Sequence, residues 1–253
     1  MIYDTHAHYD DAAFDDDRAA LLAALPERNV GTVINAATDP ASAERSIAFA
    51  RQYPYFRAAV GVHPECIGAA TEAWLAQIEI LSQEKEVCAI GEIGLDYHYP
   101  DGSSREEQLM WFRAQLALAN RRGLPVIVHD RDAHEDTLQC LREYRPRGVV
   151  HCFSGSVEMM REVVEMGMYI GLGGTVTFKN ARRPVEVAAA VPAERFLLET
   201  DAPYMAPEPM RGRRCDSSMI AYTAARIAQI RGIPADEVLR QAWQNAEGLF
   251  GAF

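Results

Sequence analysis

The sequence predicts an α/β protein that folds as one (β/α)8 TIM barrel over residues 1–253. Three observations favour this fold: eight short apolar runs, helix-length segments between them, and candidate metal ligands at the ends of five runs. Continuous apolar runs are typical of parallel strands that are covered on both faces. A doubly wound sheet is the second possibility, and its weakness is that all the strands would have to fit in one open sheet.

The expected strands span residues 1–5, 32–36, 56–60, 87–90, 125–128, 148–150, 168–172 and 195–198. The intervening segments are long enough for the helices that connect parallel strands. The clearest helix is expected over 104–122, where Ser103 and Glu106 have the spacing of a capping box. Two further helices, 217–231 and 235–250, are expected after the last strand. No linker or repeat divides the chain, so we predict one metal-dependent hydrolase domain.

Composition narrows the classes of function. No apolar run reaches 18 residues, and the N-terminus lacks a basic region followed by an apolar one, so neither a membrane span nor a secretory signal is expected. The five cysteines form no Cys-x-x-Cys pair, which argues against disulfides and thiolate zinc sites and favours the cytoplasm. The net charge of −11 disfavours broad binding to duplex nucleic acid and leaves room for a local basic patch.

Imidazoles and carboxylates stand at the ends of expected strands. These candidate ligands are His6, His8, Glu92, His129, His151 and Asp201. A lone histidine at a strand end is more often a core residue than a ligand. In a barrel, however, the C-terminal ends of the strands meet at one mouth, so this set predicts a metal site there. His6 and His8 share one strand face because they are two residues apart.

Four imidazoles and two carboxylates favour zinc, manganese or a similar divalent ion over calcium. Six ligands suggest two ions that share Glu92 as a bridge. Two divalent cations and two carboxylates leave a core of about +2, or about +1 with a bridging hydroxide. Such a core favours an anionic substrate such as a phosphodiester.

Seven motifs in order along the chain carry a resemblance to a known family. They are Asp-Thr-His-Ala-His (4–8), Gly-Val-His-Pro (61–64), Ala-Ile-Gly-Glu-Ile-Gly-Leu-Asp-Tyr (89–97), Leu-Pro-Val-Ile-Val-His (124–129), His-Cys-Phe-Ser-Gly-Ser (151–156), Gly-Gly-Thr-Val-Thr-Phe-Lys-Asn (173–180) and Leu-Glu-Thr-Asp-Ala-Pro-Tyr (198–204). The chain resembles the TatD family of metal-dependent deoxyribonucleases, in the amidohydrolase-like barrel superfamily. The resemblance implies two divalent ions (zinc, magnesium or manganese), and hydrolysis of DNA, often from the 3′ end, with RNA as a further substrate of some members.

The resemblance also implies how the ligands divide. It assigns the first metal to His6, His8, Glu92 and Asp201, and the second to Glu92, His129 and His151. Two positions depart from the family pattern: Glu65 replaces a usual histidine, and the loop 211–217 reads Arg-Gly-Arg-Arg-Cys-Asp-Ser where Asn-Glu-Pro usually ends it. These departures leave the ligands intact and the substrate preference open.

Three functions fit these residues. The first is a two-metal phosphodiesterase acting on single-stranded or frayed 3′ ends of DNA, in which Glu92 bridges the metals and Asp201 positions the attacking water or accepts its proton. The second uses the same site on a small amide, ester or lactone. The third is a non-catalytic metal-binding barrel, which the full set of ligands disfavours. No obligate protein partner is evident.

Five further residues are candidates for substrate binding: His63, Asp96, Tyr97, Lys179 and Arg211. His63 follows the third strand and could meet substrate, or Gly-Val-His-Pro could be only a turn. Asp96 and Tyr97 could orient a nucleotide or cap the next loop. Lys179 and Arg211 could bind phosphate, although charged loops are usually just solvated. His98 and His134 are expected to be peripheral, and Cys152 to serve packing.

Overall fold

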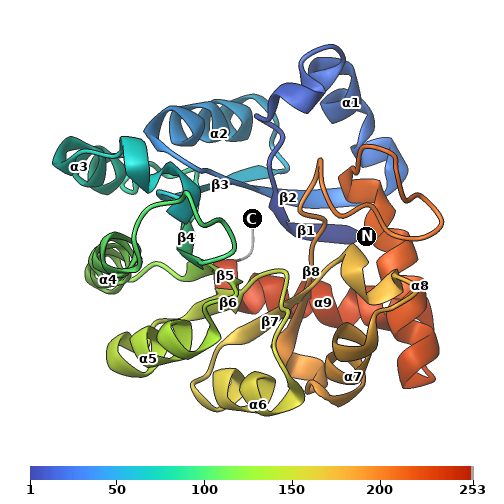
Figure 1. The fold of residues 1–253 in the computed structure, drawn as a ribbon. Helices are drawn as coiled ribbons and strands as arrows, with labels where there is room; N and C mark the ends of the chain where they lie inside the picture. Colours follow the sequence, from blue (N-terminus) through green and yellow to red (C-terminus); the bar gives the residue numbers. More distant parts are fainter. Residues whose placement is uncertain (252–253) are drawn as a thin grey trace.

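Eight parallel strands form a barrel that is ringed by helices (Figure 1). The structure, a computed structural model, describes residues 1–251. The strands are β1 (Ile2–Ala7), β2 (Val30–Ala36), β3 (Phe56–Val60), β4 (Val87–Asp96), β5 (Val126–Arg131), β6 (Gly148–Val150), β7 (Tyr169–Leu172) and β8 (Phe196–Leu198). Each strand pairs in parallel with the next one in the chain. The predicted (β/α)8 barrel is therefore confirmed.

Helices follow the strands as expected for right-handed crossovers. They are α1 (Arg18–Ala24), α2 (Pro40–Gln52), α3 (Glu72–Leu81), α4 (Arg105–Arg122), α5 (His134–Tyr144), α6 (Val157–Glu165), α7 (Arg182–Ala190), α8 (Ile220–Arg231) and α9 (Ala235–Phe250). Short 3-10 turns lie at Ala12–Phe14, Pro26–Arg28, Pro64–Ala69 (η3), Gly174–Thr177 (η4), Ala193–Arg195 and Ser217–Met219 (η6). No helix within residues 1–251 is both long and apolar enough to cross a membrane.

The barrel closes between β1 and the segment after β8. The backbone N–H of Asp201 donates to the carbonyl of His6 at 2.9 Å, and the N–H of His8 donates to the carbonyl of Ala202 at 2.7 Å. The hydroxyl of Thr5 adds a bond to the carbonyl of Leu198 at 3.1 Å. Closure therefore places Asp201 beside His6 and His8, although nearly 200 residues separate it from these histidines in the chain.

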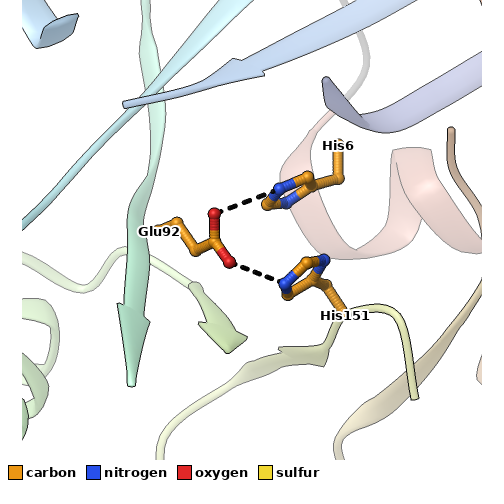
Figure 2. A group of neighbouring side chains, drawn as sticks. All are labelled: His6, Glu92 and His151. Carbon is orange, nitrogen blue, oxygen red and sulfur yellow. Dashed lines mark ion pairs between the residues drawn. The ribbon is translucent and has the colours of Figure 1, made fainter. Parts of the chain in front are cut away.

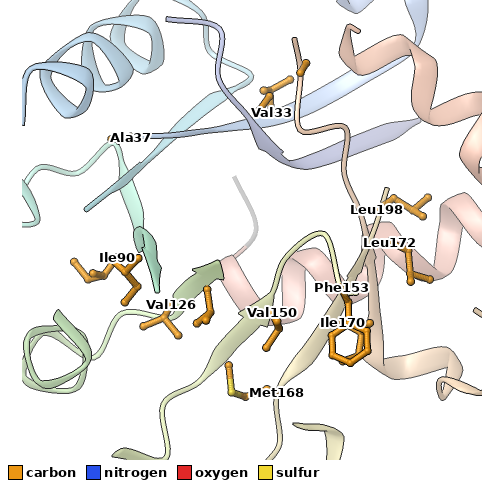
Figure 3. Packing of buried hydrophobic residues seen from close by; sticks show 14 of the residues in the cluster. Val33, Ala37, Ile90, Val126, Val150, Phe153, Met168, Ile170, Leu172 and Leu198 are labelled. Atoms are coloured by element: carbon orange, nitrogen blue, oxygen red, sulfur yellow. The ribbon is translucent and has the colours of Figure 1, made fainter. Parts of the chain in front are cut away.

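Two apolar layers lie on opposite faces of the strands. Side chains that point outward pack against the helices, among them Ile90, Val126, Val150 and Ile170 (Figure 3). A second cluster fills the barrel interior and is made of Tyr3, Ile34, Ala59, Cys88, Ala89, Ile127, Val149 and Leu197, with the end of α9 packed against it. This alternation is the period of two that strand geometry imposes.

Three local predictions were wrong in detail. The fourth strand continues past Ile90 to Asp96 and the fifth past Val128 to Arg131, so Glu92 and His129 lie within strands and not after them. The capping box of α4 is shifted by one residue: Ser104 accepts from the N–H of Glu107, and the Glu107 carboxylate accepts from the N–H of Ser104. Two serines precede two glutamates here, so spacing alone could not decide the register.

Candidate metal centre

Strand alternation explains why the ligand-type residues face the interior of the barrel. Ile127 and Val149 belong to the interior apolar cluster; His129 stands two residues further along β5, and His151 two residues beyond Val149, directly after the end of β6. Residues i and i+2 share a face, so each imidazole lies directly above an apolar side chain of the interior. The polar layer at the C-terminal mouth therefore lies on top of a buried apolar layer.

Gly94 allows β4 to approach β5 at this level. Its φ of +150° and a Cβ position only 2.0 Å from the carbonyl oxygen of His129 leave no room for a side chain. Gly94 is also the register partner of His129. A glycine here brings Glu92 of β4 close to the imidazole of β5.

Glu92 is the centre of the cluster. Its carboxylate oxygens lie 3.3 Å from His6 Nε2, 3.4 Å from His8 Nε2, 3.5 Å from His63 Nε2, 2.8 Å from His129 Nδ1 and 2.6 Å from His151 Nε2. Figure 2 shows the carboxylate between His6 and His151, with one oxygen directed at each ring. A side chain that is 3% exposed and meets five imidazoles is placed to be shared by two cations.

Asp201 supplies the second carboxylate of the cluster. Its Oδ1 lies 3.6 Å from His6 Nε2 and 3.4 Å from His8 Nε2. Three overlapping groups could each hold an ion: His6–Glu92–His151, His6–His8–Asp201 and His63–Glu92–His129. The structure thus brings all six predicted ligands together, and it adds His63, which the sequence placed only near substrate.

Hydrogen bonds on the far side of two rings fix which nitrogen faces the cluster. His8 Nδ1 lies 2.8 Å from the carbonyl oxygen of Ala36, which only accepts, so Nδ1 carries a proton and Nε2 is the nitrogen that faces the cluster. The Nε2 of His129 lies 2.9 Å from the carboxylate of Asp96, which leaves Nδ1 for the cluster. Such outer partners are typical of metal-binding histidines.

The donor set fits divalent cations. Lone pairs of nitrogen and carboxylate oxygen face each other across 2.6 to 3.6 Å, and that arrangement is repulsive unless protons or cations lie between them. His6 and His151 stack at 3.9 Å between ring centroids, and each leaves a buried Nδ1 without a hydrogen-bond partner. Imidazole and carboxylate together suit zinc, manganese or similar ions.

Electrostatics keeps both carboxylates ionised. Burial by itself would raise the pKa of Glu92, but the surrounding imidazoles, that of His151 above all, hold it well below its usual value. Burial likewise opposes the ionisation of Asp201, while the bond to His8 lowers its pKa. Burial and the nearby His151 lower the pKa of His6 to about 4, so this imidazole is neutral and free to coordinate.

Two buried acids behind the cluster were not singled out from the sequence. Asp4 accepts from Thr200 N–H at 3.0 Å, from Thr200 Oγ1 at 2.6 Å and from Ser217 Oγ at 2.7 Å, which ties the segment before Asp201 to β1. Glu199 accepts from the N–H of Cys152. Burial raises the pKa of Asp4 to about 6 and that of Glu199 to about 7. Both residues stand in quoted motifs, but only proximity reveals their partners.

Asp96 and Tyr97 have separate roles. Asp96 holds the ring of His129 and also accepts from the N–H of His98, so it both orients an imidazole and caps the following loop. The hydroxyl of Tyr97 donates to Asp136 at 2.8 Å and links β4 to α5. The expected contact of Tyr97 with a nucleotide stays a prediction, and its hydroxyl is already bound within the protein.

The basic candidates lie outside the cluster. Lys179 is exposed just after η4. Arg211 is also exposed, stacks 4.1 Å above the ring of Phe178 and donates to the carbonyl of Ala206 at 3.2 Å. His98 and His134 pair with Asp132 and Asp130, as expected of peripheral residues.

A carboxylate-centred cluster of imidazoles at the mouth of a (β/α)8 barrel defines the class of metal-dependent barrel hydrolases. A family model described as "TatD related DNase" matches residues 3–251. The chain belongs to the TatD family, and it is a TatD-type metal-dependent hydrolase. The resemblance seen in the motifs is therefore confirmed.

Relatives match the chain over nearly its full length. The Bacillus subtilis protein named "Uncharacterized metal-dependent hydrolase YabD" is 39% identical over 253 residues, which cover 99% of each chain. A protein of Erwinia tasmaniensis named "3'-5' ssDNA/RNA exonuclease TatD" is 31% identical and covers 98% of this chain and 99% of its own. The crystal structure of YjjV, a TatD homologue from Escherichia coli K12, superposes with a TM-score of 0.94 at 34% identity over 100% of this chain and 98% of the other.

Proposed function

We propose that this protein is a nuclease that hydrolyses phosphodiester bonds at the 3′ ends of single-stranded or frayed DNA, with RNA as a second substrate class. The observation that carries the proposal is the shared carboxylate of Glu92, which joins two overlapping ligand groups. His6, His8, Glu92 and Asp201 would hold one divalent ion, and Glu92, His129 and His151 the other. His63, at 3.5 Å from Glu92, is added to the second group.

Bound divalent ions, whether zinc, magnesium or manganese, would polarise a phosphoryl oxygen and lower the pKa of a bound water. The residues of the chain perform the other tasks. Asp201, ionised and next to His8, positions the attacking water and accepts its proton. Asp96 holds His129 in the tautomer that leaves Nδ1 free. The apolar layer below, including Ile127, excludes water from the underside of the site.

The substrate class follows from charge and access. A cationic core attracts a phosphodiester more than a neutral amide, ester or lactone. A barrel mouth admits an unpaired end more readily than a duplex, which must first be opened at a cost. Relatives named as 3'-5' ssDNA/RNA exonucleases support both points. The cytoplasm is the proposed compartment, in keeping with five cysteines that are all free thiols.

A substrate panel tests the proposal. Single-stranded DNA labelled at the 5′ or 3′ end, blunt duplex, RNA, a small activated phosphodiester, an amide and a lactone are each incubated with added magnesium, manganese or zinc. We expect stepwise shortening of single strands from the 3′ end and slower attack on blunt duplex. Turnover of the lactone or amide without turnover of any phosphodiester would replace the proposal with the same-site alternative. Full activity in a preparation shown by elemental analysis to be metal-free would refute metal-dependent catalysis.

A further inference from the structure

Arg131 lies at the end of β5, two residues beyond His129 and above the candidate metal centre. It follows the interior residues Ile127 and His129 along β5 at the same period of two, so its side chain begins on the interior face, one step nearer the mouth. Two strand residues advance by about 7 Å, which is comparable to one nucleotide of extended chain. Arg131 is therefore the positively charged residue of β5 that lies one step beyond the layer of candidate metal ligands.

The guanidinium of Arg131 is largely unused by the protein. It makes no ion pair with a carboxylate of residues 1–251, and its hydrogen bond goes from Nη1 to the hydroxyl of Tyr99 at 3.2 Å. A guanidinium has five N–H donors in a planar fork that suits phosphate oxygens. By contrast, Arg105 commits two donors to Asp136 at 2.6 and 2.7 Å. Arg131 thus keeps donors that a ligand could fill.

Tyr99 completes a platform beside this arginine. Tyr99 is 49% exposed, and its ring lies 5.1 Å from the Cζ of Arg131 and meets the ring of His98 edge-on at 5.1 Å. The loop that carries it follows β4 directly after Asp96, the residue that holds His129. An exposed aromatic ring next to an unpaired arginine is the combination that binds single-stranded nucleic acid, because a base can stack on the ring while the arginine takes a phosphate.

The local charges are compatible with this role. A guanidinium stays charged throughout the physiological pH range. Asp96 is occupied by His129, and the neighbouring Asp132 is occupied by His98 at 2.9 Å. Neither of these two acids forms an ion pair with Arg131.

We propose that Arg131 and Tyr99 form a binding site for the nucleotide next to the scissile bond, in which Arg131 binds its phosphate and Tyr99 stacks on its base. The site deepens the proposed function and rests on it, since it takes a single-stranded oligonucleotide as ligand. It explains how an acidic chain holds a polyanion beyond the one phosphate that meets the metals.

Steady-state kinetics of four variants test the site. Arg131→Ala should raise KM for a single-stranded oligonucleotide about tenfold, the effect of one charge-assisted contact, and leave the small phosphodiester nearly unchanged. Arg131→Lys keeps the charge but loses the planar fork of donors, so its KM should lie between those of the parent and Arg131→Ala. Tyr99→Ala should raise the same KM about tenfold, and Tyr99→Phe should stay near the parent because the ring remains.

Two further measurements assign the contacts. A methylphosphonate at the linkage next to the scissile one removes the charge that Arg131 is proposed to meet. It should raise KM for the parent and have little further effect on Arg131→Ala. A 2-aminopurine at the same nucleotide should lose fluorescence on binding to the parent and to Tyr99→Phe, but much less on binding to Tyr99→Ala.

Arg195 offers a matched control. It lies 5.2 Å above the ring of Tyr169, where β7 begins and just before β8, so the same kind of pair stands at the opposite end of the barrel. Arg195→Ala should leave KM for the oligonucleotide unchanged. If Arg131→Ala changes this KM no more than Arg195→Ala does, the proposed site is refuted. Equal losses on both substrates, or a fall in metal content, would show that Arg131 acts through His129 and would also overturn it. If the parent cleaves no nucleic acid, the proposed function fails first, before any variant is compared.

Discussion

Replacing Glu92 with glutamine is the most direct test of the cluster. The change keeps the size of the side chain and removes its negative charge. The parent carboxylate meets imidazoles of His6 and His151, among others, at 3.3 and 2.6 Å, so the variant presents an amide to groups that require an anion or a shared ligand. The variant should therefore bind metal more weakly, and its metal-free form should be less stable than that of the parent.

The expected loss of metal affinity and the expected loss of stability in the metal-free protein have different sizes. Losing an outer partner of a ligand typically weakens metal binding 10- to 100-fold, so losing the shared ligand should cost about 100-fold or more, or about 2.7 kcal/mol. In the metal-free protein the loss leaves buried imidazoles without their counter-charge, which costs about 3–5 kcal/mol. For a chain of this length that lowers Tm by roughly 10 °C at neutral pH.

Metal content after dialysis, Tm and kcat on an oligonucleotide are measured on the parent and the variant. Glu86→Gln is the control, because Glu86 is 8% exposed but stands just before β4 at the opposite end of the strand. It should keep its metal and its activity. A Glu92→Gln protein that retains two ions per chain and full turnover would refute the shared-ligand reasoning.

Three other predictions concern the surroundings of the site. Asp136→Asn removes the ion pair with Arg105, which lowers the pKa of Asp136 in the folded protein. In urea unfolding the parent should be more stable than the variant by about 1 kcal/mol above about pH 4, and this difference should vanish as the pH falls through the lowered pKa of the folded state. A difference that stays constant with pH would contradict this. Ser217→Ala leaves buried Asp4 one partner short and should lower stability by about 2 kcal/mol in the same assay; no change would mean that water replaces the hydroxyl. Arg211→Ala should raise KM for an oligonucleotide about tenfold and spare a small phosphodiester; equal losses would assign Arg211 to loop stability.

Most of the fold could be predicted because parallel strands leave a strong local signal. Runs such as 125–128 and 148–150 are apolar throughout, since both of their faces are buried. The ends of elements were less certain. β4 continues through Glu92 to Asp96 because its polar residues find partners inside the barrel, which no local pattern reports.

Much of the candidate site could also be predicted, for a reason of topology. The C-terminal ends of barrel strands converge, so a ligand-type residue at a strand end is already placed near the others. His63 was set apart because it follows β3 in a turn, and only the 3.5 Å approach to Glu92 joins it to the cluster. Arg131 was not singled out from the sequence, because the expected fifth strand ended at residue 128 and a charged residue beyond a strand is usually solvated.

The sequence by itself determined the barrel, the six ligand-type residues at its mouth and the resemblance to one family, because each depends on local pattern or on order along the chain. Only the tertiary structure decided which nitrogen of His8 and of His129 faces the cluster, and that Tyr97 binds Asp136. It also decided that Arg131 lacks a carboxylate partner within the described residues. These facts depend on distances between side chains far apart in sequence, which closure of the barrel sets.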